Sequence, residues 1–406
     1  MEEHSRPHTE TVKTGTPVNP DNGVPENTGP RRQRVFLLLK ASGITALAFL
    51  LSYLLTSPFT ATLSALFSSP EKNDFKMSDL LCQIADDRPV RDFDDRIVIL
   101  DIGNLDRPGI AEVFSILALC EPAAVAIDIN FEVPSDNDST LLAALSALPN
   151  VILPLGLRQK GNKFEISEKP FFYGKFNNVK YGAANFPTSR VGATVREYAE
   201  SFPLTDGSVL PSFPKATALA SGLKTDLKEN PDNVETGFIR YHSKEIPLIH
   251  YEELEERAEQ IFNKTVLVGT TTDAGDVYPT PIHSSLSGLE IHSYALSTIL
   301  DGSRIERLPK IIADLIAVLS CFLIVWGAVG IKWGTRGLLL RFAQVVILYL
   351  LVWIGYSLLV DYEIVSDFSQ AILMVTFGLF AFDLWTGSEV IVKWSKKKIN
   401  NYRTKH

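Results

Sequence analysis

The chain has 406 residues, of which 46% are hydrophobic, and its mean hydropathy is slightly positive. This composition is too apolar for an ordinary soluble protein and too polar for a bundle of membrane helices alone. The formal net charge of −8 gives a nucleic-acid-binding function no electrostatic support. The three cysteines are too few for a disulfide-dense scaffold or a cysteine-rich zinc module.

Residues 1–34 are predicted to be a disordered cytoplasmic tail, because their first 30 residues are rich in Pro, Thr, Asn, Gly and Glu and lack apolar periodicity. A basic run ending at Arg34 precedes an apolar stretch at residues 35–56, which is long enough for a transmembrane helix. A cleaved signal peptide is the alternative, and the long polar leader disfavours it.

Three further apolar stretches are long enough to span a bilayer, at residues 310–331, 338–360 and 368–386. The first connector between them carries Lys332 and Arg336, the second (residues 361–367) is acidic, and the tail at residues 387–406 is basic. The positive-inside rule therefore places both termini in the cytoplasm and residues 57–309 outside it. We predict a multi-pass protein of the inner (cytoplasmic) membrane.

Two apolar runs, Ile97–Asp101 and residues 124–128, flank a helical pattern at residues 108–119. Short β-branched runs around a helix are typical of a βαβ unit with buried parallel strands. Ligands of such sheets bind at the carboxyl ends of the strands, where Asp101 and Asp128 lie. We therefore predict an α/β domain with a mostly parallel sheet, inserted between one N-terminal and three C-terminal transmembrane helices.

The rest of this domain continues to alternate between helices and strands. Further strands are expected at residues 151–155, 181–186, 195–201, 237–241 and 266–269. Further helices are expected at residues 139–148, 211–221, 251–260 and 288–300. The last of these is expected to continue into the second span and so to connect the domain with the membrane.

Several aspartates follow apolar runs, and convergence of these side chains at one sheet edge would form a ligand site. The loop after the 266–269 strand is rich in hydroxyl residues and could offer backbone N–H groups to an anion, and His292 lies beyond it. The alternative is that the aspartates cap turns and helices and that the histidine belongs to the core. The candidate ligand-binding residues are Asp101, Asp128, Asp138, Thr270, Thr272, Asp276 and His292.

The chain lacks the sequence motifs of the common enzyme classes. It contains no phosphate-binding Gly-x-x-x-x-Gly-Lys-Ser/Thr loop, no His-Glu-x-x-His and no Gly-x-Ser-x-Gly, and its histidines lack metal-ligand spacing. We therefore expect no enzymatic activity, cofactor or metal. Cys82 and Cys120 both lie in the predicted exported domain, where a disulfide is possible; two buried small apolar side chains are the alternative.

The order of these motifs resembles the CHASE type 2 domain, the extracellular sensory domain of bacterial cyclases and histidine kinases. The resemblance covers roughly residues 75–302 and rests on Ile97–Asp101, residues 122–131 with Asp138, Tyr181-Gly182 with Asn185, residues 211–214, and residues 264–276 with Gly288, Glu290-Ile291-His292 and residues 299–302. One span before the domain and three after it also resemble the family arrangement. Only about 20 residues follow the last span, where relatives carry a catalytic output domain.

The resemblance implies a bacterial membrane receptor that signals to a separate cytoplasmic effector, and it suggests a homodimer. Its extracytoplasmic domain is expected to bind a small ligand or a periplasmic protein. An envelope docking or assembly protein is the first alternative, and an extracytoplasmic hydrolase is the second.

Overall fold

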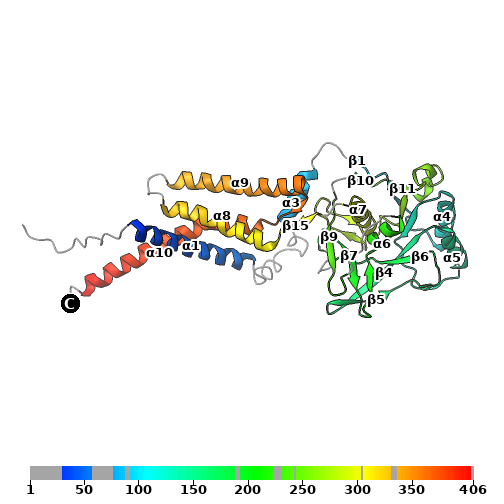
Figure 1. The fold of residues 1–406 in the computed structure, drawn as a ribbon, viewed down its shortest axis with the longest axis horizontal. Helices are drawn as coiled ribbons and strands as arrows, with labels where there is room; N and C mark the ends of the chain where they lie inside the picture. Colours follow the sequence, from blue (N-terminus) through cyan, green and yellow to red (C-terminus); the bar gives the residue numbers. More distant parts are fainter. Residues whose placement is uncertain are drawn as a thin grey trace, which may run out of the picture.

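Four long apolar helices form a bundle, and an α/β domain stands at one end of it in the computed structural model (Figure 1). The structure describes residues 30–56, 76–86, 92–136, 138–187, 193–222, 230–241, 244–302, 305–330 and 336–403. The bundle helices are α1 (Pro30–Thr56), α8 (Lys310–Gly330), α9 (Arg336–Tyr362) and α10 (Ser369–Arg403). Each is long and apolar enough to cross a membrane.

The α/β domain is built on a seven-stranded sheet with the order β11-β2-β12-β3-β4-β5, in which β6 also pairs with β4. All of these pairs are parallel except β4 with β5. The predicted mixed α/β domain with mostly parallel strands is therefore confirmed. The strands are β2 (Ile97–Asp101), β3 (Ala124–Ile127), β4 (Val151–Lys160), β5 (Lys163–Glu168), β6 (Val179–Ala183), β11 (Leu248–His250) and β12 (Thr265–Gly269).

Helices cover both faces of this sheet. Alternate residues of a strand point to opposite faces, so Val98 and Leu100 pack with α4 (Arg107–Leu119) and α5 (Asp138–Ala147). Ile97 and Ile99 pack on the other face, with α6 (Phe213–Ala220) and α7 (Gly288–Leu300). Because both faces are buried, the central strands are continuous apolar runs in the sequence. In Figure 1, α6 and α7 lie on the side of the sheet nearer the bundle, and α4 and α5 lie on the far side.

A smaller antiparallel sheet, β8-β7-β9, lies between the main sheet and the bundle (Figure 1). Its strands are β7 (Glu197–Pro203), β8 (Val209–Pro211) and β9 (Glu235–Phe238). The remaining elements are α3 (Met77–Asp86), β1 (Asp92–Phe93), β10 (Lys244–Glu245), η2 (Tyr251–Glu253), η3 (Ala258–Gln260), β13 (Val277–Tyr278), β14 (Leu286–Ser287), β15 (Glu306–Arg307) and β16 (Ile364–Val365).

Two expectations about helices are wrong. The helix expected at residues 251–260 is replaced by the short 3-10 turns η2 and η3. Tyr251, Leu254 and Ala258 pack against the core, but a segment of this length gains little from helix formation by itself. The continuous connection from the 288–300 helix into the second span does not form. Helix α7 ends at Leu300, and Gly302 has a φ of 64°, a left-handed conformation that terminates helices. The chain then passes through β15 before α8 begins.

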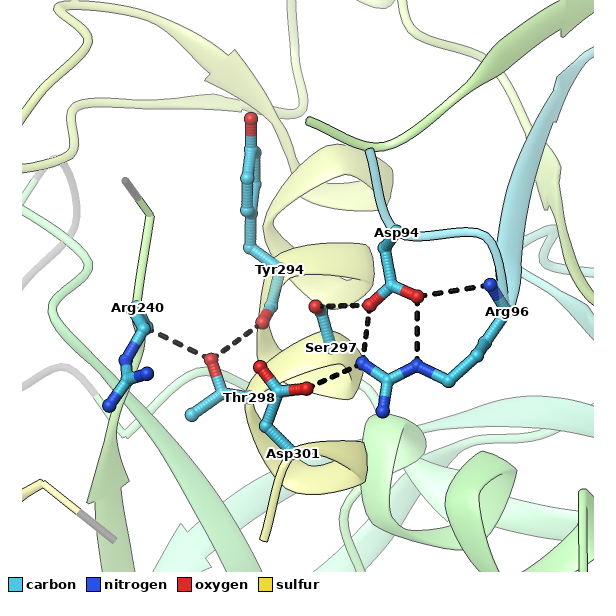
Figure 2. A network of polar contacts seen from close by, with 7 residues as sticks. All are labelled: Asp94, Arg96, Arg240, Tyr294, Ser297, Thr298 and Asp301. Carbon is cyan, nitrogen blue, oxygen red and sulfur yellow. Dashed lines mark hydrogen bonds and ion pairs between the residues drawn. The ribbon is translucent and has the colours of Figure 1, made fainter. Parts of the chain in front are cut away.

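The last turn of α7 is fixed to the segment before β2 by a charge network around the buried Asp94 (Figure 2). Asp94, fully buried, accepts hydrogen bonds from Arg96 Nε (2.9 Å), Arg96 Nη2 (2.6 Å) and Ser297 Oγ (2.5 Å). Arg96 Nη2 also lies 2.7 Å from the carboxylate of Asp301. Burial opposes ionisation of Asp94, but the hydrogen bonds from Arg96 and Ser297 outweigh it and lower its pKa to about 2.

A second set of contacts holds the opposite side of the same turn. Thr298 Oγ1 accepts a hydrogen bond from the Arg240 amide at 3.0 Å and donates one to the Tyr294 carbonyl oxygen at 2.8 Å (Figure 2). The end of α7 is thus bonded to the segment before β2 and to the segment after β9.

The charge on Asp94 is expected to stabilise the fold in a pH-dependent way. Because its pKa falls from 3.8 to about 2 on folding, the contribution is present above pH 4 and is lost as the pH falls toward 2. It amounts to about 2 kcal/mol, since one pKa unit corresponds to about 1.4 kcal/mol. In thermal unfolding of the full chain followed by circular dichroism, the melting temperature of Asp94→Asn should be below that of the wild type at pH 6. The gap should narrow toward pH 2; a gap independent of pH would contradict this assignment.

Candidate functional site

Polar residues meet at one edge of the main sheet, where parallel strands β11, β2, β12 and β3 end. His250, Asp101 and Gly269 lie opposite one another in the register of β11, β2 and β12. Asp128 follows β3 directly, and its amide donates a hydrogen bond to the Val268 carbonyl oxygen at 2.8 Å. Asp101 and Asp128 therefore both lie at the carboxyl ends of the strands, as their positions in the sequence predict, with β12 between their two strands.

Asp101 fixes the loop that follows β12. Its carboxylate is buried and accepts hydrogen bonds from Thr271 Oγ1 (2.6 Å) and from the Gly103 amide (2.9 Å). The imidazole Nδ1 of His250 lies 3.6 Å from the same carboxylate. Because its oxygens are bonded to the protein, Asp101 positions this loop. Its partner in the loop is Thr271, which lies between the two predicted site residues Thr270 and Thr272. Those two residues, Thr270 and Thr272, instead place their hydroxyls 3.2 Å from each other.

Asp128 and Asp276 form an acidic pair beside the N-terminus of α7. Burial and, to a smaller extent, the neighbouring Asp276 carboxylate together raise the pKa of Asp128 to about 7. The pKa of Asp276 is also raised, mainly by burial, although hydrogen bonds from Tyr278 and from the Gly288 amide oppose the shift. A side chain at Gly288 would collide with the Asp276 carboxylate. The glycine is thus what lets this carboxylate lie against the helix start.

The N-terminus of α7 is set by a capping box in which Ser287 Oγ accepts from the Glu290 amide and Glu290 Oε2 accepts from the Ser287 amide at 2.9 Å. One turn further on, His292 is buried, and the ring of Phe186 stacks on it with centroids 4.6 Å apart. Phe186 also contacts Tyr278 edge-on. The aromatic rings therefore connect His292 to the acidic pair.

His292 is an uncharged member of this group. Burial lowers its pKa to about 3, against the effect of a hydrogen bond with the Ala184 backbone. Its Nδ1 has no hydrogen-bond partner among the described residues. The imidazole is consequently neutral at physiological pH, and it could offer one hydrogen-bonding nitrogen but no charge.

The last predicted site residue, Asp138, lies elsewhere. It begins α5, on the face of the sheet opposite α7, where it forms an ion pair with Arg107 and accepts a hydrogen bond from the Ser135 amide at 2.6 Å. Arg107 in turn lies over the rings of Phe131 and Phe171. Asp138 thus stabilises the start of α5, as the capping alternative predicted.

The possible disulfide is also not formed. Cys82 and Cys120 are free, buried thiols. Cys82 packs in the cluster between the domain and the bundle, whereas Cys120 belongs to the core beneath α4 and α5. Within the described part of the chain, no group of three or more His, Cys, Asp or Glu side chains is arranged to hold a metal ion.

A family model for the CHASE2 domain matches residues 59–332. The chain belongs to the CHASE2 domain family. The resemblance deduced from the sequence is therefore confirmed, and the match extends over the α/β domain and into the bundle. No curated protein and no solved structure gave a match. CHASE2 domains are extracytoplasmic sensory domains, and together with the four helices able to cross a membrane they support a sensory membrane protein.

Sequence reasoning missed four residues of this site: His250, Thr271, Tyr278 and Phe186. No strand is expected at His250, which precedes the helix expected at residues 251–260, although it ends the edge strand β11. Tyr278 and Phe186 lie far apart in the sequence, and their rings come into contact only in the folded chain. Thr271 could have been found, because it lies between two threonines already selected.

Asp128 is expected to destabilise the fold when it ionises. Because its pKa rises from 3.8 to about 7 on folding, the stability contributed by its protonated form is present below pH 4 and is lost as the pH rises through 7. Asp128→Asn mimics the protonated acid, so this variant should be more stable than the wild type by up to about 4 kcal/mol at pH 8. The melting temperatures of the two proteins should converge near pH 4.

The matched control is Asp136→Asn, which removes an exposed aspartate from the same region of the chain. An equal pH dependence of stability in the two variants would refute the special position of Asp128.

Proposed function

We propose that this protein is a membrane-bound sensory receptor. Its CHASE2 domain binds a small ligand or an extracytoplasmic protein at the strand edge occupied by Asp128 and Asp276. A ligand with hydrogen-bond donors or a positive charge suits the acidic pair. The signal then passes through the four helices to a separate cytoplasmic effector. The observation that carries the proposal is one apolar cluster, shared between the domain and the bundle, through which a change in one can bias the other.

This membrane-proximal cluster joins segments that are far apart in the sequence. It combines α3, the end of β9, the linker before α8, the end of α9 and β16. Its buried members are Leu81, Cys82, Ala85, Phe238, Ile305, Leu359 and Val365. A shift of the domain that moved any one of these side chains would alter the packing of the others, because close-packed interiors transmit small displacements.

Backbone pairing reinforces the same connection. Strand β15, which leads into α8, pairs with β16, which lies between α9 and α10. The Glu306 amide donates to the Glu363 carbonyl oxygen at 3.0 Å, and the Leu308 amide donates to the Val365 carbonyl oxygen at 2.9 Å. Arg240, just beyond β9, forms an ion pair with Glu363 at 2.5 Å. Three bundle helices are thereby bonded to the domain at one place.

A buried ion pair fixes α3 to the domain. Arg196 Nε and Nη2 each donate to the carboxylate of Asp79 at 2.7 Å, and both residues are buried. Removing one member of such a pair leaves an uncompensated buried charge, which costs about 3–5 kcal/mol. The segment that follows the first span is therefore rigidly attached to the sensory domain, which suits transmission of a conformational change.

We propose that helix α10 transmits the conformational change from the domain to the cytoplasm. It begins at Ser369, directly after β16, and is continuous to Arg403, past the basic residues Lys393, Lys396, Lys397 and Lys398. A displacement at β16 would move this helix as one body. Placing its basic end in the cytoplasm follows the positive-inside rule, and that end is where we place the contact with the effector.

A docking role in the cell envelope is the second candidate. Leu119, 83% exposed, ends α4, and Phe262, 60% exposed, lies in the turn before β12. The hydrogen bond from the Asn263 amide to the Glu121 carbonyl oxygen joins the two segments. Contiguous exposed apolar patches mark protein contacts, and this pair of side chains is where we place the docking contact.

The proposed orientation is tested by labelling introduced cysteines with a membrane-impermeant maleimide. Ser135→Cys places a thiol on the exposed surface of the domain, and Lys396→Cys places one near the end of α10. In intact spheroplasts the first variant should label and the second should label only after permeabilisation. The parent chain, whose three cysteines are buried, is the blank. Labelling of Lys396→Cys from outside would reverse the proposed topology.

Transmission can be followed with the natural tryptophans, because all five lie between residues 326 and 394. Titration of Asp128 between pH 5 and pH 8 serves as a stimulus confined to the sensory domain. The tryptophan emission of the full chain should change across this range in the wild type. The change should be lost in Asp128→Asn, which cannot titrate, and in Val365→Ala, which loosens the membrane-proximal cluster.

Asp136→Asn is the matched control and should behave as the wild type. An emission that does not respond to pH in the wild type, or that responds equally in Asp128→Asn, would contradict transmission from this site and favour the docking role.

A further inference from the structure

Two cavities adjoin each other beside the membrane-proximal cluster. The first, here called the head cavity, has a volume of about 710 Å³ and lies where α1, α8 and α10 meet the domain. The second, here called the tail groove, has a volume of about 720 Å³ and runs between α1 and α8. Phe49 lines both. The two cavities are therefore neighbours along the same pair of helices.

The chemistry of the head cavity suits an anion. Four cationic side chains line it, from Lys76, Arg196, Arg307 and Lys310, against two carboxylates. Arg196 is committed to Asp79, but the side chains of Arg307 and Lys310 are 57% and 85% exposed even with their ion-pair partners in place. Both therefore keep N–H donors available to a ligand.

The guanidinium groups of Arg196 and Arg307 also repel each other in this cavity. Burial lowers the pKa of Arg307, and the nearby positive charge of Arg196 lowers it further. A phosphate between these groups would relieve the repulsion and form charge-assisted hydrogen bonds.

The chemistry of the tail groove is that of an acyl chain. Its lining consists of apolar side chains, among them Ala46, Leu315 and Leu319, with Thr45 and Ser42 as hydroxyl residues. The Thr45 hydroxyl already donates to the Ala41 carbonyl oxygen at 2.9 Å, so it does not need a hydrogen-bond acceptor from a ligand. A hydrocarbon occupant would leave no polar group of Thr45 unpaired.

The dimensions match one leaflet of a bilayer. Lys310 lies at the start of α8, in the head cavity, and Phe322 lines the tail groove 12 residues further along the same helix. This separation corresponds to about 18 Å of helix. Half of a hydrocarbon core is about 15 Å thick. A molecule with a charged head and a chain of this length fits the two cavities together.

We propose that one anionic phospholipid of the outer leaflet occupies both cavities, with its phosphate on Arg307 and Lys310 and an acyl chain between α1 and α8. This site deepens the proposed function, because it rests on the membrane-spanning arrangement described there. Arg307 belongs to β15, which pairs with β16. The lipid headgroup therefore binds at the connection that carries the signal, and its occupancy sets how firmly the domain is held to the bundle.

The test uses the full chain in a mild detergent and native mass spectrometry with phosphatidylglycerol or phosphatidylcholine as the added lipid. Phosphatidylglycerol should bind more tightly by roughly fivefold or more, the effect of about one charge near a membrane surface. sn-Glycero-3-phosphoglycerol, which carries the same phosphodiester headgroup without chains, should not compete at equal concentration. Effective competition by this soluble phosphate would overturn the lipid assignment.

Two pairs of variants test the contributions of the head cavity and of the tail groove to lipid binding separately. Lys310→Gln removes an exposed cation of the head cavity and should weaken phosphatidylglycerol binding roughly fivefold, whereas Lys393→Gln removes the same charge far from it and should not. Ala46→Phe fills the tail groove and should abolish most of the retained lipid, whereas Leu323→Phe adds bulk on α8 outside the groove. Leu323 is 49% exposed and does not line the groove.

Equal binding of the two lipids, or equal behaviour within either pair of variants, would overturn the proposal. The melting temperature of each variant, measured without lipid, identifies any that fails to fold, in which case Arg307→Gln and Leu319→Phe replace Lys310→Gln and Ala46→Phe. The lipid experiments measure binding, and the tryptophan experiment, done without added lipid, measures transmission. A negative result in one therefore does not decide the other. The two proposals are therefore tested separately.

Discussion

The burial of one apolar cluster between the sensory domain and the bundle is the constraint on which the arrangement of this protein depends. Leu81 of α3, Phe238 of β9 and Val365 of β16 share this cluster, although nearly 300 residues separate the first from the last. Each element contributes only one to three buried side chains to this cluster, so each is covered by residues of the other elements. Strand pairing between β15 and β16 adds backbone hydrogen bonds to the same place. The domain and the bundle therefore cannot move independently without exposing apolar surface or breaking these bonds.

The carboxylates removed from water in the domain are of two kinds, those with an arginine partner and those beside another carboxylate. Asp94 and Asp79 are buried with arginine partners at hydrogen-bond distance, and they attach α7 and α3 to the rest of the fold. Asp128 and Asp276 are placed next to each other beside the start of α7, and the pKa of each is raised. A carboxylate with an arginine partner stabilises the native state, whereas a desolvated acidic pair disfavours ionisation. That unfavourable arrangement is retained at the strand edge, where α/β proteins bind their ligands.

The family assignment and the contacts at the base of the domain point in the same direction. A CHASE2 domain is a sensor, and a sensor needs a mechanical path to the membrane. In this chain the connection between the domain and the bundle is not a helix continued from α7, since Gly302 terminates that helix. It is a set of short strands and side chains that joins the starts of α8 and α10 to the end of α9. A cavity with exposed cations opens beside this connection, and it is where we propose that a membrane lipid binds.

The sequence by itself determined the elements whose signal is local and strong. Strands Ile97–Asp101 and Thr265–Gly269, the helices beside them and the four apolar helices were all evident, because buried parallel strands and membrane-length helices leave continuous apolar runs. The placement of Asp101 and Asp128 at the same edge of the sheet also followed, since parallel strands end at one edge.

Only the tertiary structure decided which neighbour each side chain would meet. It bonded Asp101 to Thr271, placed Asp138 with Arg107 on the opposite face, and kept the two extramembrane thiols apart in separate clusters. Strands as short as β15 and β16, two residues each, carry no periodic pattern. They form because packing of the domain against the bundle brings their backbones together, and that packing depends on contacts between residues hundreds of positions apart.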